Sequence, residues 1–175
     1  LSRVLQRLNI TQKKTLYDPK KYEASRQERL HDYWKQVSLA QGKEFLYLDE
    51  SGACCNLTPA YGYARRGERA YEGNPTAKGV RISAIGAISQ KGLVTSFCFE
   101  GTLNGAVFTT FIEQFLAPHL HKNTVLVLDN ASVHKNKQAQ TMIEETGAQL
   151  LFLPPYSPQL NPIEYCWAKA KQVIR

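Results

Sequence analysis

In the stretch TVLVLDN, residues 124–130, a near-continuous apolar run at 124–128 is followed directly by an acid, Asp129. Such a run is typical of a central strand buried on both faces of an α/β sheet, because a strand with one wet face alternates apolar and polar residues. A second short apolar run, FLYL at 45–48, also ends on an acid, Asp49. Ligands of open α/β sheets bind in the crevice outside the carboxyl ends of the strands. The two runs therefore predict neighbouring parallel strands that bring Asp49 and Asp129 together.

The segments around these runs complete an α/β pattern. Short apolar segments between turn residues predict strands at 80–89, 93–100 and 149–153, and a further short strand at 61–66. Helical spacing of apolar residues predicts helices at 20–37, 105–119, 135–146 and 161–174. The order of these elements predicts a mixed five-stranded sheet with helices on both faces, the order of the ribonuclease-H-like fold.

Several classes of protein are disfavoured by the composition. The 175 residues suit one domain with a short appendage, and no apolar run approaches the roughly 20 residues that span a bilayer. No secretory signal is visible, and the spacing of the four cysteines fits no zinc motif. We therefore expect a protein without membrane association, with free thiols, in a reducing cytoplasm.

The first 43 residues differ from the rest of the chain in charge. They hold 10 Lys or Arg against 4 Asp or Glu, whereas residues 44–175 hold 12 against 11. Such a basic arm suits a polyanion partner, because Lys and Arg neutralise phosphates and release counterions. A solvated helical surface is the alternative explanation.

Three acids stand at the ends of predicted elements. Asp49 and Asp129 follow strands, and Glu164 lies in the first turn of the helix predicted at 161–174. Adjacent carboxylates repel one another, so a compensating cation is expected, and hard oxygen ligands suit Mg²⁺ or Mn²⁺. Two such ions roughly 3.5–4 Å apart can activate a nucleophilic oxygen and stabilise the leaving oxygen of a phosphodiester.

Each acid also has a structural explanation. Asp49 or Asp129 alone would suit any junction between a strand and a loop. Glu164 alone would suit a capping box, in which Asn161 is the N-cap and Pro162 the first helical residue. The three acids together, at these positions, favour the metal site.

Three longer motifs carry a family resemblance. The strings LDES at 48–51, LDNASVHK at 128–135 and LPPYSPQLNPIEYCWAKAK at 153–171 resemble the catalytic motifs of bacterial insertion-sequence transposases of the mariner superfamily. Asp129 and Glu164 differ by 35 positions, a spacing characteristic of many members. The resemblance extends from about Phe45 to the last residue.

The resemblance implies a DDE-type endonuclease and strand transferase in which Asp49, Asp129 and Glu164 bind two ions of Mg²⁺ or Mn²⁺. Enzymes of this type cut double-stranded DNA at transposon ends and join the 3′-hydroxyl to target DNA, usually at TA, as dimers. They carry helix-turn-helix modules before the catalytic domain. We therefore expect 1–42 to be the remnant of such a region with a basic linker, and 43–175 to be a catalytic domain cut short within its last helix.

Other residues are weaker candidates. Asn130 and His134 follow Asp129 closely and are candidates to support it. Asn130 would orient Asp129 or line the site; His134 would touch a phosphate or a water molecule, or alternatively make a structural hydrogen bond within its loop. Candidates for DNA contacts are Arg65, Arg66, Arg69, Lys13 and Lys14. Glu50 follows Asp49, but strand alternation places it on the opposite face of the sheet.

Two other functions remain open. The chain is also compatible with a catalytically inactive, transposase-derived DNA-binding protein, although all three acids are present. Another nuclease of the ribonuclease-H-like fold would normally need a fourth acid near the site. A retroviral-type integrase is disfavoured, because its His/Cys zinc module has no counterpart here.

Overall fold

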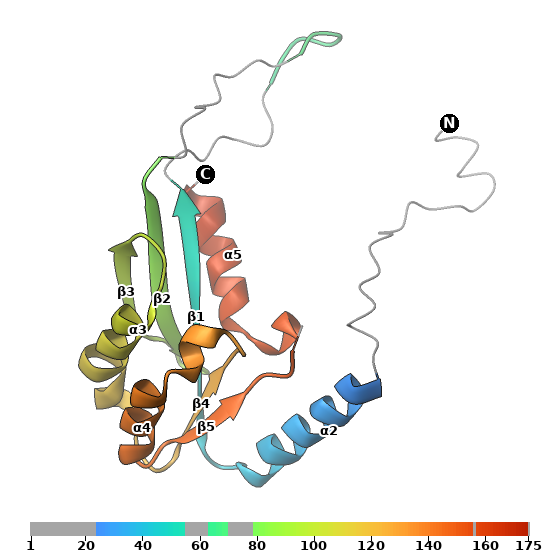
Figure 1. The fold of residues 1–175 in the computed structure, drawn as a ribbon. Helices are drawn as coiled ribbons and strands as arrows, with labels where there is room; N and C mark the ends of the chain where they lie inside the picture. Colours follow the sequence, from blue (N-terminus) through green and yellow to red (C-terminus); the bar gives the residue numbers. More distant parts are fainter. Residues whose placement is uncertain (1–23, 55–62, 70–78, 156, 175) are drawn as a thin grey trace, which may run out of the picture.

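A computed structural model describes residues 24–54, 63–69, 79–155 and 157–174, which are organised around one mixed sheet (Figure 1). In the described residues the five strands are β1 (Glu44–Cys54), β2 (Arg81–Ser89), β3 (Gly92–Glu100), β4 (Thr124–Leu128) and β5 (Gln149–Phe152). Their order across the sheet is β3-β2-β1-β4-β5. The β1–β2 and β2–β3 pairs are antiparallel, and the β1–β4 and β4–β5 pairs are parallel. The predicted mixed sheet is therefore confirmed.

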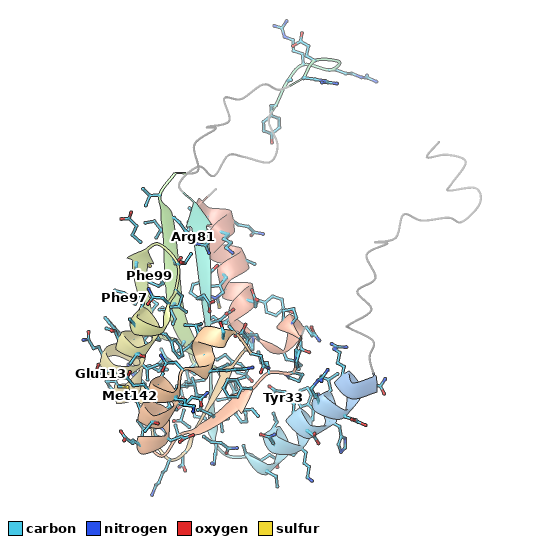
Figure 2. All side chains as sticks on the ribbon, in the orientation of Figure 1. Tyr33, Arg81, Phe97, Phe99, Glu113 and Met142 are labelled. Carbon is cyan, nitrogen blue, oxygen red and sulfur yellow. The ribbon has the colours of Figure 1, made fainter. Side chains whose placement is uncertain are left out.

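Alternation along the central strands divides the core between the two faces of the sheet. Leu126 and Leu128 belong to one buried cluster with residues of the helices α3 (Gly105–Phe111) and α4 (Lys137–Glu145). Val125 and Val127 point the other way, into a cluster with Tyr33 of α2 (Ala24–Leu39), which Figure 2 labels. Both faces of β4 are thus covered, which explains why its sequence is apolar without interruption.

The last helix, α5 (Ile163–Ile174), runs alongside β1, as Figure 1 shows. Its first residue, Ile163, is buried, and Trp167 one turn later lies against Gly86 of β2. An added Cβ at Gly86 would stand 3.3 Å from Trp167 Cη2, so glycine permits this close approach. The packing fixes the start of α5 against the sheet.

The strand β1 is longer than predicted. The sequence indicated an end at Asp49, whereas β1 continues to Cys54. Its parallel ladder with β4 ends at Tyr47, but its antiparallel ladder with β2 continues to the pair of Cys54 and Arg81. The second partner keeps the backbone extended after the apolar run has ended.

The strand predicted at 61–66 is wrong for the residues that the structure describes. Residues 63–66 have no strand structure and lead into a turn, in which the Glu68 N–H donates to the Arg65 carbonyl oxygen at 2.9 Å. Gly67 in that turn has φ +91°, a conformation that glycine adopts readily. Residues 61 and 62 lie outside the described part.

The other helices follow the predicted order with different ends. Instead of one helix at 105–119, α3 passes into a π-helical turn (Ile112–Leu116) and a 3₁₀ turn (Ala117–His119). The helix predicted at 135–146 begins at Lys137, because Asn136 caps it by accepting from the Gln138 and Ala139 N–H groups.

No helix within the described ranges is long and apolar enough to cross a membrane. Cys98 and Cys166 are free thiols.

Candidate active site

The register of the sheet determines where the first two acids lie. The parallel ladder pairs Tyr47 of β1 with Val127 of β4. Two residues further along each strand, Asp49 and Asp129 are therefore level with each other and share a face of the sheet. Asp49 is 8 % exposed.

One cavity brings these acids together with the third. Asp49, Asp129 and Glu164 all line a cavity of about 170 Å³, with Glu164 contributed by the first turn of α5. The remaining wall comes from the end of β5 and the proline-rich loop after it: Leu153, Pro154, Ser157, Pro158 and Asn161. Three acids that are far apart in sequence thus border one space, as predicted.

The electrostatics of the cavity follow from this crowding. Burial, together with the negative charges of Glu50, Glu164 and Asp129, raises the pKa of Asp49 to about 7, against the lowering effect of the Glu50 backbone N–H. None of the described residues that line the cavity is a Lys or Arg, so its wall supplies no positive charge to Asp49. A divalent cation would supply that charge, and oxygen ligands of this kind suit Mg²⁺ or Mn²⁺.

The three carboxylates border the cavity without enclosing it. Among the described residues, no three His, Cys, Asp or Glu side chains lie close enough to hold an ion in their present positions. Repulsion between like charges favours such a spread arrangement. Glu164 is exposed, whereas Asp49 is buried.

Asp129 is held by two hydrogen bonds to the same oxygen. Its Oδ1 accepts from the Ala131 backbone N–H at 2.8 Å and lies 2.6 Å from Nδ1 of His134. The hydrogen bond from His134 is the main reason that the pKa of Asp129 is lowered, against the raising effect of burial. Asp129 therefore stays ionised beside Asp49, whose pKa is raised.

The candidate supporting residues both make hydrogen bonds inside the protein. The Asn130 side chain donates to the Leu153 carbonyl oxygen and so joins the end of β4 to the start of the proline loop. His134 is fully buried, and its ring centroid lies 5.0 Å from that of Phe108. The His134 ring contacts carboxylates in the interior rather than a surface where a phosphate would bind.

His134 also contacts an acid that the sequence left aside. Its Nε2 lies 3.3 Å from Oε2 of Glu50, which occupies the face of β1 opposite to Asp49. Burial alone would lower the pKa of His134, but the hydrogen bond to Asp129 and the nearby carboxylate of Glu50 raise it to about 9. Glu50 belongs to the motif LDES and His134 to the motif DNASVH, but nothing in either motif indicated that these two side chains are in contact.

Asn161 is a second residue whose position the sequence did not indicate. Its side chain is 3 % exposed and lines the cavity, and its Oδ1 has no hydrogen-bond partner among the described residues. The Asn161 backbone oxygen, not the side chain, accepts from the Glu164 N–H at 3.2 Å. The side-chain half of the capping box is therefore not formed, and a buried acceptor oxygen is left without a partner among the described residues.

The basic candidates for DNA contacts are only partly described. Arg65, Arg66 and Arg69 are exposed in the turn at 63–69. Lys13 and Lys14 lie outside the described residues, as do residues 1–23 of the helix-turn-helix remnant and basic linker expected at 1–42. The role of these five residues stays a prediction.

The family to which the chain belongs follows from a match over most of its length. The model of the DDE superfamily endonucleases matches residues 44–175. The chain therefore belongs to this family, and the predicted class of enzyme, a DDE endonuclease, is confirmed. Among curated proteins, none matches the sequence significantly.

Solved structures of the Mos1 transposase have a similar fold. The Mos1 strand transfer complex aligns with a TM-score of 0.76 and 20 % identity, over 99 % of this chain and 55 % of that chain. The mariner Mos1 paired-end complex with Mg aligns with a TM-score of 0.75 and 19 % identity, over 99 % of this chain and 56 % of that chain. The Mos1 paired-end complex with the left transposon end aligns with a TM-score of 0.73 and 18 % identity, over 99 % of this chain and 56 % of that chain. The chain thus spans little more than half of the Mos1 chains, and the likeness confirms the ribonuclease-H-like fold.

Proposed function

We propose that this chain is the catalytic part of a transposase of the mariner superfamily, encoded by a bacterial insertion sequence. Asp49, Asp129 and Glu164 would hold two ions of Mg²⁺ or Mn²⁺ in the cavity just beyond the end of the ladder between β1 and β4. The observation that carries the proposal is that three acids from three separate elements line one small cavity in a DDE endonuclease fold.

The chemistry of the residues fits this role. When bound, two divalent ions would activate the attacking oxygen and stabilise the leaving oxygen of a phosphodiester. Asp129 stays ionised because of His134, and Asp49 is held at the level of Asp129 by the sheet. Glu164, an exposed residue in the first turn of α5, would be the third ligand. The unpaired Oδ1 of Asn161 is placed to accept a hydrogen bond from a bound water.

The number of acids at the cavity favours a transposase over a ribonuclease H, which would normally need a fourth. The described residues that line the cavity include three acids, and Glu50, which follows Asp49 in sequence, is on the other face of β1 and is paired with His134. The intact triad likewise disfavours an inactive DNA-binding derivative. Such a derivative predicts that metal binding at the three acids is weak or absent.

The remaining parts of the proposal concern partners and location. We propose double-stranded DNA at transposon ends and at a TA target as the substrate, and a homodimer as the form bound to DNA. Two of the similar Mos1 structures are described as a paired-end complex with the left transposon end and as a strand transfer complex. We also propose that the protein is located in a bacterial cytoplasm and associates with the nucleoid when it is bound to DNA.

Anomalous scattering from crystals soaked in millimolar Mn²⁺ tests the metal site. We expect a peak between Asp49, Asp129 and Glu164 in the parent protein and none in Asp129→Asn. Asp32→Asn, which changes an exposed aspartate of α2, is the matched control and should keep the peak. A well-ordered parent crystal without a peak at this place would contradict the proposed function.

A further inference from the structure

The imidazole of His134 connects carboxylates from the two faces of the sheet. Its Nδ1 lies 2.6 Å from Oδ1 of Asp129, and its Nε2 lies 3.3 Å from Oε2 of Glu50. The side chain of His134 is fully buried, whereas that of Glu50 is 32 % exposed. The ring comes from the 3₁₀ turn Ser132–Lys135, which passes the end of β4 and so reaches both faces.

The partners of the ring determine where its hydrogens are. An ionised carboxylate can only accept hydrogen bonds, so a nitrogen that faces a carboxylate has to donate. Both nitrogens of His134 face carboxylates, which gives a ring with two N–H groups and a positive charge. A buried charge has to be paired, and the ring is paired on both sides: Nδ1 is hydrogen-bonded to Asp129, and Nε2 forms an ion pair with Glu50 at 3.3 Å.

The contact with His134 restricts how Asp129 can turn. Both hydrogen bonds of the Asp129 carboxylate described above fall on Oδ1, one from the Ala131 backbone and one from His134. Packing of the His134 ring against the buried Phe108 restricts the ring itself. With Oδ1 fixed in this way, Oδ2 is the oxygen that is left for another partner.

We propose that Glu50 and His134 are positioning residues for the metal centre: Glu50 fixes the imidazole, the imidazole fixes Oδ1 of Asp129, and Oδ2 is thereby presented to the cation. The inference rests on the proposed function in that it takes Asp129 as a metal ligand. Glu50 does not line the cavity, so it acts through His134 and not as a ligand.

Manganese binding to the full chain, measured by isothermal titration calorimetry, tests the consequence for the metal. Loss of a group that orients a ligand typically weakens metal binding about 10–100-fold. We expect Glu50→Ala to weaken Mn²⁺ binding within this range. Glu50→Gln, which keeps an acceptor oxygen for Nε2, should restore most of the affinity. Glu145→Ala, which changes an exposed acid of α4, is the matched control and should bind as the parent does.

A double-mutant cycle tests whether Glu50 acts through His134. In a His134→Ala background, Glu50→Ala should have no further effect on the Mn²⁺ affinity, because the intermediate is missing. Circular dichroism and thermal unfolding establish that each variant is folded. Since Glu50 is partly exposed, the Glu50 variants remain informative even if His134→Ala fails to fold.

Nitrogen-15 NMR of the metal-free protein tests the arrangement without relying on the proposed function. We expect two slowly exchanging ring N–H signals from the buried His134, and loss or a large shift of the Nε2 signal in Glu50→Ala. Addition of Mg²⁺ should shift the Nδ1 signal more than the Nε2 signal, because Nδ1 contacts the ligand.

The results separate the two proposals. If the parent does not bind Mn²⁺ but shows both N–H signals that respond to Glu50→Ala, the proposed function fails and the arrangement of the three side chains stands. If the parent binds Mn²⁺ and Glu50→Ala binds it equally well, the positioning role is overturned and the proposed function stands. Equal reductions in affinity from Glu50→Ala with and without His134 would also overturn the positioning role.

Discussion

Replacing Asp49 by asparagine should stabilise the metal-free protein at alkaline pH. Asp49 is 8 % exposed and its pKa is raised from 3.8 to about 7, first by burial and then by the charges of Glu50, Glu164 and Asp129. The folded state therefore binds the proton of Asp49 more tightly than the unfolded state does. The contribution of Asp49 to stability is fully present below about pH 4 and is lost as the pH rises through 7.

The size of the effect follows from the pKa. A rise from 3.8 to about 7 corresponds to a penalty of about 4 kcal/mol for the ionised form above pH 7. The asparagine side chain has a similar shape and no charge, so the variant Asp49→Asn avoids this penalty. Even half of that figure would raise the melting temperature of a chain of this size by roughly 4–8 °C.

The assay is thermal unfolding followed by circular dichroism, in EDTA, at pH 8 and at pH 4. We expect Asp49→Asn to melt above the parent at pH 8 and close to it at pH 4, where Asp49 is protonated. Asp32→Asn, the exposed control, should melt with the parent at both pH values. A variant that melts at or below the parent at pH 8 would refute the reasoning, because the carboxylate would then carry no penalty.

Three further outcomes are expected. Mn²⁺ at about 100 times its dissociation constant should stabilise the parent by about 2.7 kcal/mol in thermal unfolding, and Asp129→Asn should remove that gain; equal gains in both would place the ion elsewhere. Replacing Arg65, Arg66 and Arg69 by alanine should reduce the slope of log affinity for duplex DNA against log salt by about 0.9 for each phosphate that is no longer neutralised, and an unchanged slope would exclude the turn from the DNA interface. Phe108→Ala should lower the free energy of unfolding in urea by about 3–5 kcal/mol, because Phe108 is fully buried; a decrease below about 1 kcal/mol would contradict its place in the core.

The centre of the fold was predictable because its sequence pattern has one explanation. The apolar run at 124–128 has the same first and last residues as β4, since a strand covered on both faces needs apolar side chains in both directions. The end of β1 was not predictable, because residues 50–54 are polar or small and stay extended only through pairing with β2. A short apolar segment between turn residues predicted a strand at 61–66, but the described residues there have no partner strand to pair with.

The candidate site was predictable in its acids and not in its supporting residues. Asp49 and Asp129 end apolar runs, and strand geometry places such residues at one edge of the sheet. The contact of His134 with Glu50 depends on a short 3₁₀ turn that passes the end of β4, and no periodicity indicates such a turn. The burial of Asn161 depends in the same way on how the proline loop folds over the acids.

The ladder between β1 and β4 also determines which insertions and deletions the protein can tolerate. Because side chains alternate along a strand, deleting one residue from 45–48 would turn Asp49 away from the cavity and bring Glu50 to its face. Lengthening the connection at 101–104, between β3 and α3, would leave every pair of that ladder unchanged. Among relatives, the distance in sequence from the first acid to the second should therefore vary freely, while the number of residues from the start of β1 to the first acid should keep its parity.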